Sequence, residues 1–212
     1  MIFKRRKETV QPVGLSFRSS SLTAVNLDPG DCRWIDVLRY SIARGGDDRE
    51  ILRALIATPG YAHSYARPRL NPTREESEDI HGPYRRTHIR ESHYRRIDSA
   101  AAREELHDWI FDPDALSPAD APPTPTPDNR VLAEMIATSQ PITTDDVVHL
   151  SPDVPPILEW ILDDSRRLYR LDDLREIAEH DWGWVVGALG YIEIASISAD
   201  GSEVALLVAS DD

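Results

Sequence analysis

The chain has little cysteine and little lysine, and it lacks any long hydrophobic run. Its single cysteine, Cys32, excludes an intramolecular disulfide and fits a reducing compartment. No segment approaches the roughly 18 consecutive apolar residues that a membrane-spanning helix needs. The basic residues 1–7 are not followed by the apolar stretch of a secretory signal. We therefore expect a cytoplasmic protein without membrane association.

Motifs that specify a reaction are also missing. The sequence has no Gly-x-Ser-x-Gly nucleophile elbow and no Asp-x-Asp-x-Asp-Gly calcium loop. Gly183, Gly187 and Gly190 lack the lysine and the following helix that a phosphate-binding loop requires. These absences favour a protein that is not an enzyme, and they indicate no cofactor.

Charge is distributed very unevenly along the chain. Residues 1–96 carry 18 Lys and Arg against 12 Asp and Glu, whereas residues 97–212 carry 6 against 25. Such an asymmetry creates a long-range field, which bears on partners and on association rates rather than on the fold.

Hydrophobic periodicity predicts an α+β fold. Alternating apolar residues on both sides of a serine-rich turn indicate a β-hairpin over residues 13–27. Trp34, Leu38 and Ile42 recur every four residues and predict a helix over 29–44, followed by a second helix over 48–57. Near the C-terminus, residues 190–198 and 203–209 flank Asp200-Gly201, a pattern typical of a hairpin with a tight turn.

The middle of the chain changes character twice. Residues 60–96 are rich in Tyr, His and Arg and poor in aliphatic residues, so we expect a long surface excursion with a short strand or helix near 87–95. Residues 99–111 then read as a helix capped by Ser99. Six prolines in 112–128 indicate an extended linker. Short helical patterns follow at 130–138, 144–150, 156–163 and 172–181.

These features divide the chain into three predicted parts. Residues 1–111 form an α+β segment that contains the excursion, residues 112–128 form the proline-rich linker, and residues 129–212 form an acidic helical segment that ends in a β-hairpin. Whether the two halves form one domain or two is left open by the sequence.

Histidines in the excursion suggest a metal site as one alternative. His81, His88, Glu91 and His93 are candidate ligands of a metal-dependent hydrolase built within residues 81–107. His88 and His93 are five residues apart, which suits neither the i, i+4 spacing of a zinc-protease helix nor one face of a strand. The spacing therefore weakens this alternative.

Nucleic-acid binding is a second alternative, because the same excursion is rich in side chains that stack on bases or contact phosphates. The candidate binding residues are Tyr84, Arg85, Arg86, Tyr94, Arg95 and Arg96. A polyanion would be repelled by the strongly acidic second half of the chain, which disfavours this interpretation.

The sequence best fits a non-catalytic cytoplasmic protein-binding module or regulator, of the immunity or antitoxin kind, that presents an acidic surface. Its expected partner is another protein, and a basic one would complement the acidic surface. The sequence does not specify the oligomeric state.

Overall fold

The computed structural model describes residues 13–25, 33–65, 79–111, 151–180 and 190–211. Its centre is a six-stranded antiparallel sheet with the strand order β1-β2-β8-β7-β6-β5. The strands span Gly14–Ala24 (β1), Arg33–Arg44 (β2), Tyr94–Ile97 (β5), Arg167–Leu171 (β6), Tyr191–Ile197 (β7) and Glu203–Asp211 (β8). The predicted α+β class is confirmed. None of the described helices is long and apolar enough to cross a membrane.

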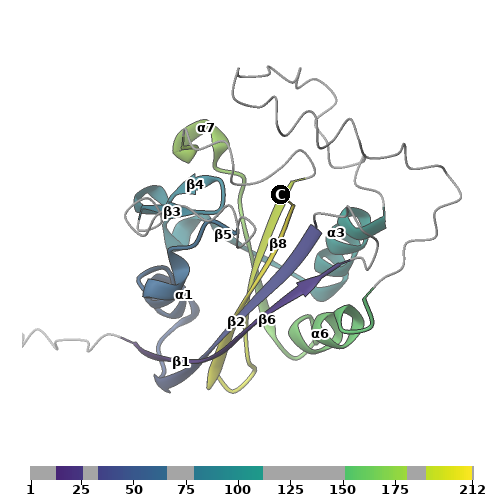
Figure 1. Ribbon diagram of the computed structural model, residues 1–212. Helices are drawn as coiled ribbons and strands as arrows, with labels where there is room; N and C mark the ends of the chain where they lie inside the picture. Colours follow the sequence, from purple (N-terminus) through teal and green to yellow (C-terminus); the bar gives the residue numbers. More distant parts are fainter. Residues whose placement is uncertain (1–12, 26–32, 66–78, 112–150, 181–189, 212) are drawn as a thin grey trace, which may run out of the picture.

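A layer of structure covers each face of the sheet (Figure 1). The first layer packs on the face that carries Tyr40, Leu206 and Ala195. It contains α1 (Asp48–Ile56), η1 (Pro59–Tyr61), the two-stranded sheet of β3 (Ile80–His81) and β4 (Tyr84–Arg85), and α7 (Arg175–Ala178). The second layer contains α3 (Ser99–Phe111) and α6 (Val154–Ile161), which pack on the face that carries Ile35 and Leu207.

The C-terminal hairpin is confirmed. β7 and β8 pair from Ile197 with Val204 to Tyr191 with Ser210. The turn between them contains Gly201 at φ +69°, a conformation that glycine adopts at little cost. This hairpin occupies the middle of the sheet, where its strands are buried on both faces.

The predicted helix over 29–44 is wrong, because residues 33–44 form β2. Trp34, Leu38 and Ile42 are four residues apart, a spacing that places them on one face of a strand as well as on one stripe of a helix. Ile35 and Val37 fill the opposite face of the strand and pack against the second layer. β-branched residues on both faces favour the strand.

The predicted hairpin within 13–27 is replaced by a wider one. Residues 14–24 form the single strand β1, which runs through the serine-rich stretch and pairs antiparallel with β2. The serines therefore lie within a strand and do not form a turn. The sequence interpretation also missed β6, whose sequence Arg-Leu-Tyr-Arg-Leu lacks the strict alternation of apolar and polar residues that marks a strand.

Two predicted helices are confirmed, α1 and α3. α1 begins with a capping box, in which the Asp47 side chain accepts from the Glu50 amide and the Glu50 carboxylate accepts from the Asp47 amide. The cap of α3 is Asp98 instead of the predicted Ser99, since Asp98 Oδ1 accepts from the Ala101 amide at 2.8 Å. The predicted helix over 156–163 corresponds to α6, and that over 172–181 is reduced to the one-turn α7.

In its described parts, residues 60–65 and 79–96, the excursion is not a solvated surface segment. Its aromatic residues enter the first layer, and Tyr61, Tyr65, Tyr84 and Tyr94 are all buried. Aromatic side chains replace the missing aliphatic residues as core, which the search for aliphatic periodicity could not detect. The described parts also contain η2 (Arg86–His88) and η3 (Glu91–His93), and β5 fits the short strand expected nearby.

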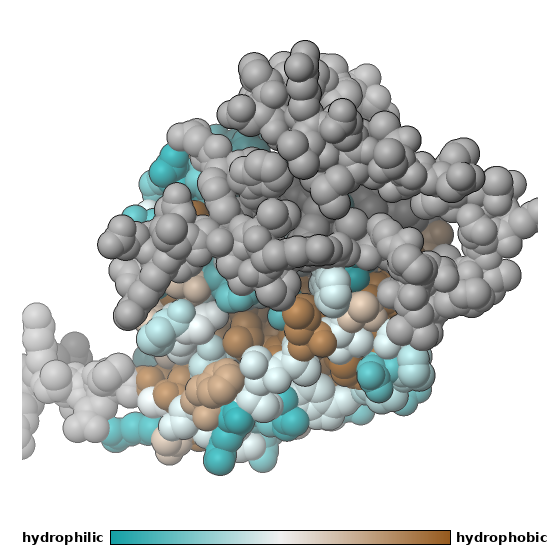
Figure 2. Space-filling view, in the orientation of Figure 1, coloured by the Kyte–Doolittle hydropathy of each residue, from teal (hydrophilic) through white to brown (hydrophobic). Residues whose placement is uncertain are grey.

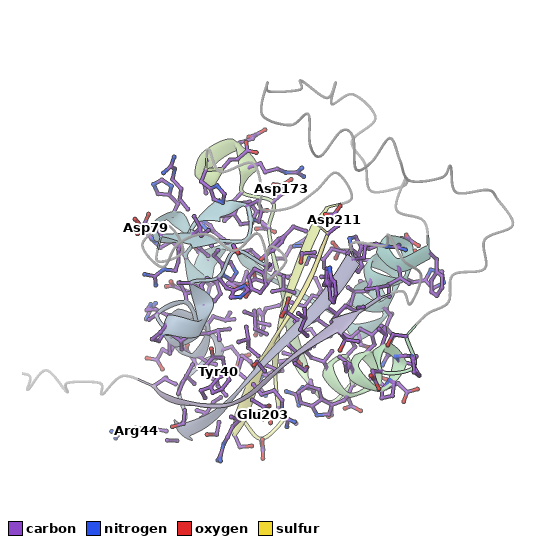
Figure 3. The ribbon with its side chains drawn as sticks, in the orientation of Figure 1. Tyr40, Arg44, Asp79, Asp173, Glu203 and Asp211 are labelled. Atoms are coloured by element: carbon purple, nitrogen blue, oxygen red, sulfur yellow. The ribbon has the colours of Figure 1, made fainter. Side chains whose placement is uncertain are left out.

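Strands from both sides of the proline-rich segment contribute to one sheet. β1, β2 and β5 precede residues 112–128, and β6, β7 and β8 follow them. Ion pairs also join the two parts of the chain: Arg39 contacts Glu203 at 2.7 Å, and Arg167 contacts Asp48 at 2.9 Å. Glu203 and Asp211 mark the two ends of β8 (Figure 3). The predicted linker, the helical patterns at 130–138 and 144–150, Gly183, Gly187 and Cys32 lie outside the described residues.

Candidate functional site

Glu193, near the start of β7, is the most unusual residue of the described structure. Its side chain is completely buried, and the next two residues on the same face of the strand, Ala195 and Ile197, are apolar. Burying a carboxylate costs several kcal/mol unless hydrogen bonds and a countercharge compensate it. The groups around Glu193 must therefore supply both.

Four side chains donate to the Glu193 carboxylate. Oε1 accepts from the Tyr61 hydroxyl at 3.0 Å and from the Tyr94 hydroxyl. Oε2 accepts from the Tyr191 hydroxyl at 2.6 Å and from His81 Nε2. The donors come from η1, β5, β7 and β3, so one carboxylate connects four separate elements. We call Tyr61, His81, Tyr94, Tyr191 and Glu193 the Glu193 cluster.

The hydrogen bonds of His81 determine its charge. Nδ1 faces the backbone carbonyl of Tyr61, which can only accept, and Nε2 faces the Glu193 carboxylate. Both ring nitrogens must donate, so His81 is an imidazolium when Glu193 is ionised. The Tyr61 ring stacks on the imidazolium at 3.5 Å between ring centres, an arrangement that favours the cation.

Electrostatics agree with an ionised Glu193. Burial acts to raise its pKa, but the charge of His81 and the hydrogen bonds from His81, Tyr191 and Tyr94 outweigh burial and hold the pKa of Glu193 below its usual 4.5. Burial, reinforced by the nearby Glu193 charge, raises the pKa of the Tyr61, Tyr94 and Tyr191 hydroxyls well above 10. These hydroxyls therefore stay protonated and act as donors.

Tyr65 and His63 lie at the border of the cluster. Tyr65 adopts φ +62°, the left-handed region that non-glycine residues rarely occupy, and its amide donates to His63 Nδ1 at 2.9 Å. Burial and the charge of His81 lower the pKa of His63, which favours the neutral ring that accepts this bond. The Tyr65 ring meets His81 edge-on at 5.3 Å.

The Glu193 cluster is suited to holding the fold together. Its imidazole and carboxylate are completely buried, and protein groups occupy every hydrogen-bonding position of His81 and both oxygens of Glu193. A general acid or base must reach a substrate proton within hydrogen-bonding distance. As arranged, the pair instead fixes η1, β3 and β5 to the central strand β7.

Acid should weaken the fold through Glu193. Because the folded pKa of Glu193 lies below its unfolded value, its contribution is complete above about pH 4.5 and is lost as the pH falls through the folded pKa. Urea unfolding between pH 7 and pH 3 should show a steeper loss of stability for the wild type than for Glu193→Gln. Glu159→Gln, at an exposed position of α6, serves as control and should follow the wild type. Parallel curves for Glu193→Gln and the wild type would exclude this role.

The candidate metal ligands are not brought together. His81 is engaged with Glu193, and Glu91 pairs with Arg53. His93 Nδ1 accepts from the Arg90 amide at 3.2 Å, and His88 is exposed. Within the described ranges, no group of three or more His, Cys, Asp or Glu side chains is placed to hold a metal ion.

The candidate nucleic-acid residues divide into two groups. Tyr84 and Tyr94 are buried, and the Tyr94 hydroxyl is a donor to Glu193, so neither ring is presented for stacking on bases. Arg85, Arg95 and Arg96 are exposed and Arg86 is half-buried. Arg95 lies 3.7 Å from Asp172.

Acidic side chains gather on the second layer. Within residues 99–111 and 151–165 taken together, Arg103 is the only Lys or Arg. Its guanidinium donates to the Leu162 carbonyl at 3.1 Å. The Ser99 hydroxyl donates to Asp164, which also joins the two helices. The exposed acids of this layer, here called the α3–α6 acidic face, are Glu104, Asp153, Glu159, Asp163 and Asp164.

Sequence reasoning did not identify Glu193, Tyr61 or Tyr191 as members of one cluster. One signal was present: Glu193 interrupts the apolar run of a strand that was itself predicted. A carboxylate in a strand buried on both faces requires partners, but the partners come from residues 61, 81 and 94, which are distant in sequence. Comparison with protein-family models, curated proteins and solved structures gave no match.

Proposed function

We propose that the protein is a non-catalytic protein-binding module that docks a basic partner on the α3–α6 acidic face. The observation that carries this proposal is that α3, α6 and the residues flanking α6 carry five exposed acids and a single arginine of their own. Arg39 and Arg166 lie over Trp160 of α6, and Arg170 pairs with Glu105 of α3. None of the five exposed acids is in an ion pair with these three arginines. A surplus of one charge on a surface steers an oppositely charged partner toward it.

The first layer supports the same proposal by contrast. There the arginines and acids alternate and pair, as in Arg53 with Glu91 and Arg175 with Asp173. The buried His81 and Glu193, the titratable pair best suited to catalysis, serve the fold. Among the described residues, the α3–α6 acidic face is therefore the charged surface that we assign to recognition of a partner.

The proposal is tested by neutralising the acidic face. The variant Glu104→Gln/Asp153→Asn/Glu159→Gln removes three exposed acids from it, and the control Asp79→Asn/Glu176→Gln/Glu179→Gln removes three exposed acids from the first layer. Proteins captured from native lysate by the wild type should be retained by the control and lost by the first variant.

The captured partner is then purified and its association rate is measured at about 50 and 300 mM salt. The rate should fall several-fold for the wild type, because the Debye length shortens to less than about 8 Å over this range. A wild type that captures no partner, a partner retained by the acidic-face variant, or an association rate that ignores salt would each overturn the proposal.

A further inference from the structure

β1 forms one edge of the six-stranded sheet, and among the described strands only β2 pairs with it (Figure 1). It is eleven residues long; eight of its positions are exposed and the other three are half-buried. Proteins usually protect such an edge with proline, lysine, inward charges, β-bulges or very short strands. β1 has no proline or lysine, and of these devices it has one charged residue, Arg18, and a bulge at the same position.

Exposed hydrophobic side chains follow the same strand. Phe17 is 57% exposed and Leu22 is 48% exposed, and the other large exposed hydrophobic residues of the described structure are Phe111 and Ile177. Phe17 pairs with Tyr40 and Leu22 with Asp36, so both project from the sheet face that carries the first layer. Figure 2 shows hydrophobic side chains at the surface over the front of the sheet, where β1 runs.

A bulge divides the strand. The register with β2 passes from Phe17 opposite Tyr40 to Ser19 opposite Arg39, which leaves Arg18 as the extra residue. On the first-layer face the order of side chains is therefore Leu15, Phe17, Ser20 and Leu22. On the second-layer face it is Ser16, Ser19, Ser21 and Thr23.

We propose that the outer edge of β1 binds a second copy of this chain, with the two β1 strands antiparallel around a two-fold axis at Ser20. Arg18 is the extra residue of the bulge in each copy and has no opposite residue. This register places Ser21 opposite Ser19 of the second copy and Leu22 opposite Phe17 of the second copy. In each of these pairs, both side chains project from the same face of the sheet. The Phe17 and Leu22 side chains meet twice, once on each side of the axis.

Size and charge are both compatible with this pairing. At about 3.4 Å per residue the edge is about 37 Å long, and its backbone and side chains can bury on the order of the 800 Å² per partner of a stable interface. The net charge of −13 per copy opposes association, but β1 carries no acid. The two Arg18 side chains lie on opposite sides of the axis, away from each other.

The proposed dimer does not depend on the proposed docking of a basic partner. The two associations can be distinguished by their opposite dependence on salt concentration. Screening should strengthen an association between two negatively charged copies, whereas it should weaken the binding of a basic partner. A two-fold axis perpendicular to the sheet also keeps both α3–α6 acidic faces on the same side of a continuous twelve-stranded sheet.

The test measures the mass of the full chain in solution by sedimentation and light scattering. The wild type should be a dimer that tightens with salt, and Phe17→Lys/Leu22→Lys should raise the dissociation constant by about tenfold or more. Phe111→Lys/Ile177→Lys is the matched control, because it changes the other two exposed hydrophobic residues, and it should leave the dimer intact. Circular dichroism verifies that both variants fold.

A cysteine placed on the axis provides a second measurement. In a Cys32→Ser background, Ser20→Cys should form a disulfide between copies on mild oxidation, because paired antiparallel residues have Cα atoms about 4.5–5.5 Å apart. Ser16→Cys lies away from the axis and should not crosslink. A monomeric wild type, a dimer that survives Phe17→Lys/Leu22→Lys, or crosslinking at Ser16 in place of Ser20 would overturn the proposal.

Discussion

Replacing Glu193 with alanine should lower the free energy of unfolding by about 3–5 kcal/mol, the loss typical when one partner of a buried ion pair is removed. The substitution removes the countercharge of His81 and the acceptor of three tyrosine hydroxyls. Since domains of this kind are stable by about 5–15 kcal/mol, much of the margin would be lost.

Urea unfolding at pH 7 provides the measurement. Glu193→Gln keeps the side-chain shape and an acceptor oxygen, so its loss should be smaller than that of Glu193→Ala. Glu159→Ala, at an exposed position of α6, is the control and should stay within about 0.5 kcal/mol of the wild type. If Glu193→Ala lost no more than this control, the cluster would not stabilise the fold.

Local signals in the sequence were sufficient where a single element determines its own structure. The Asp200-Gly201 turn between two apolar runs fixed the C-terminal hairpin, and the 3.6-residue periodicity of Ile51, Leu52 and Leu55 fixed α1. The helix over 99–111 was predicted with its observed bounds. In each case the residues that determine the element lie within a few positions of one another.

The sequence was insufficient where tertiary contacts determine the structure. The i, i+4 spacing of Trp34, Leu38 and Ile42 fits a helix and a strand equally, and the choice depends on pairing with β1 and with β8, which is about 170 residues away in sequence. The tyrosines of the excursion resembled a polar surface because the hydroxyls of Tyr61 and Tyr94 find their acceptor, Glu193, only in the folded state.

The charge asymmetry was an informative signal that needed the structure for its interpretation. Several arginines pair with acids from the other side of the proline-rich segment, as Arg170 does with Glu105 at 2.8 Å. Summing charges along the chain therefore overstated how far opposite charges are separated in space. Within the described residues, the α3–α6 acidic face is one place where exposed acids outnumber arginines.

Replacing Gly82 with alanine should destabilise the protein more than the same change at Gly201, although both glycines have positive φ. A residue other than glycine costs roughly 1–2 kcal/mol in this backbone region. At Gly201 that cost stands alone, because the nearest atom to an added Cβ is a guanidinium nitrogen of Arg167 at 4.0 Å. At Gly82 an added Cβ would lie 2.7 Å from Tyr191 Cζ, a distance that forces the ring to move.

Movement of Tyr191 would break its 2.6 Å hydrogen bond to Glu193 and disturb its 3.1 Å contact with His81 Nε2. We therefore expect Gly82→Ala to cost about 1–3 kcal/mol more than Gly201→Ala, the range for a buried polar group that loses its partner. In the Tyr191→Phe background the hydrogen bond is already absent, so the two glycine substitutions should differ less there. Urea unfolding of the four variants completes the comparison. Suppose instead that Gly82→Ala and Gly201→Ala lower the free energy of unfolding equally in the wild-type background. The Tyr191 ring would then move without loss of stability, and the stability of the Glu193 cluster would not depend on the position of Tyr191.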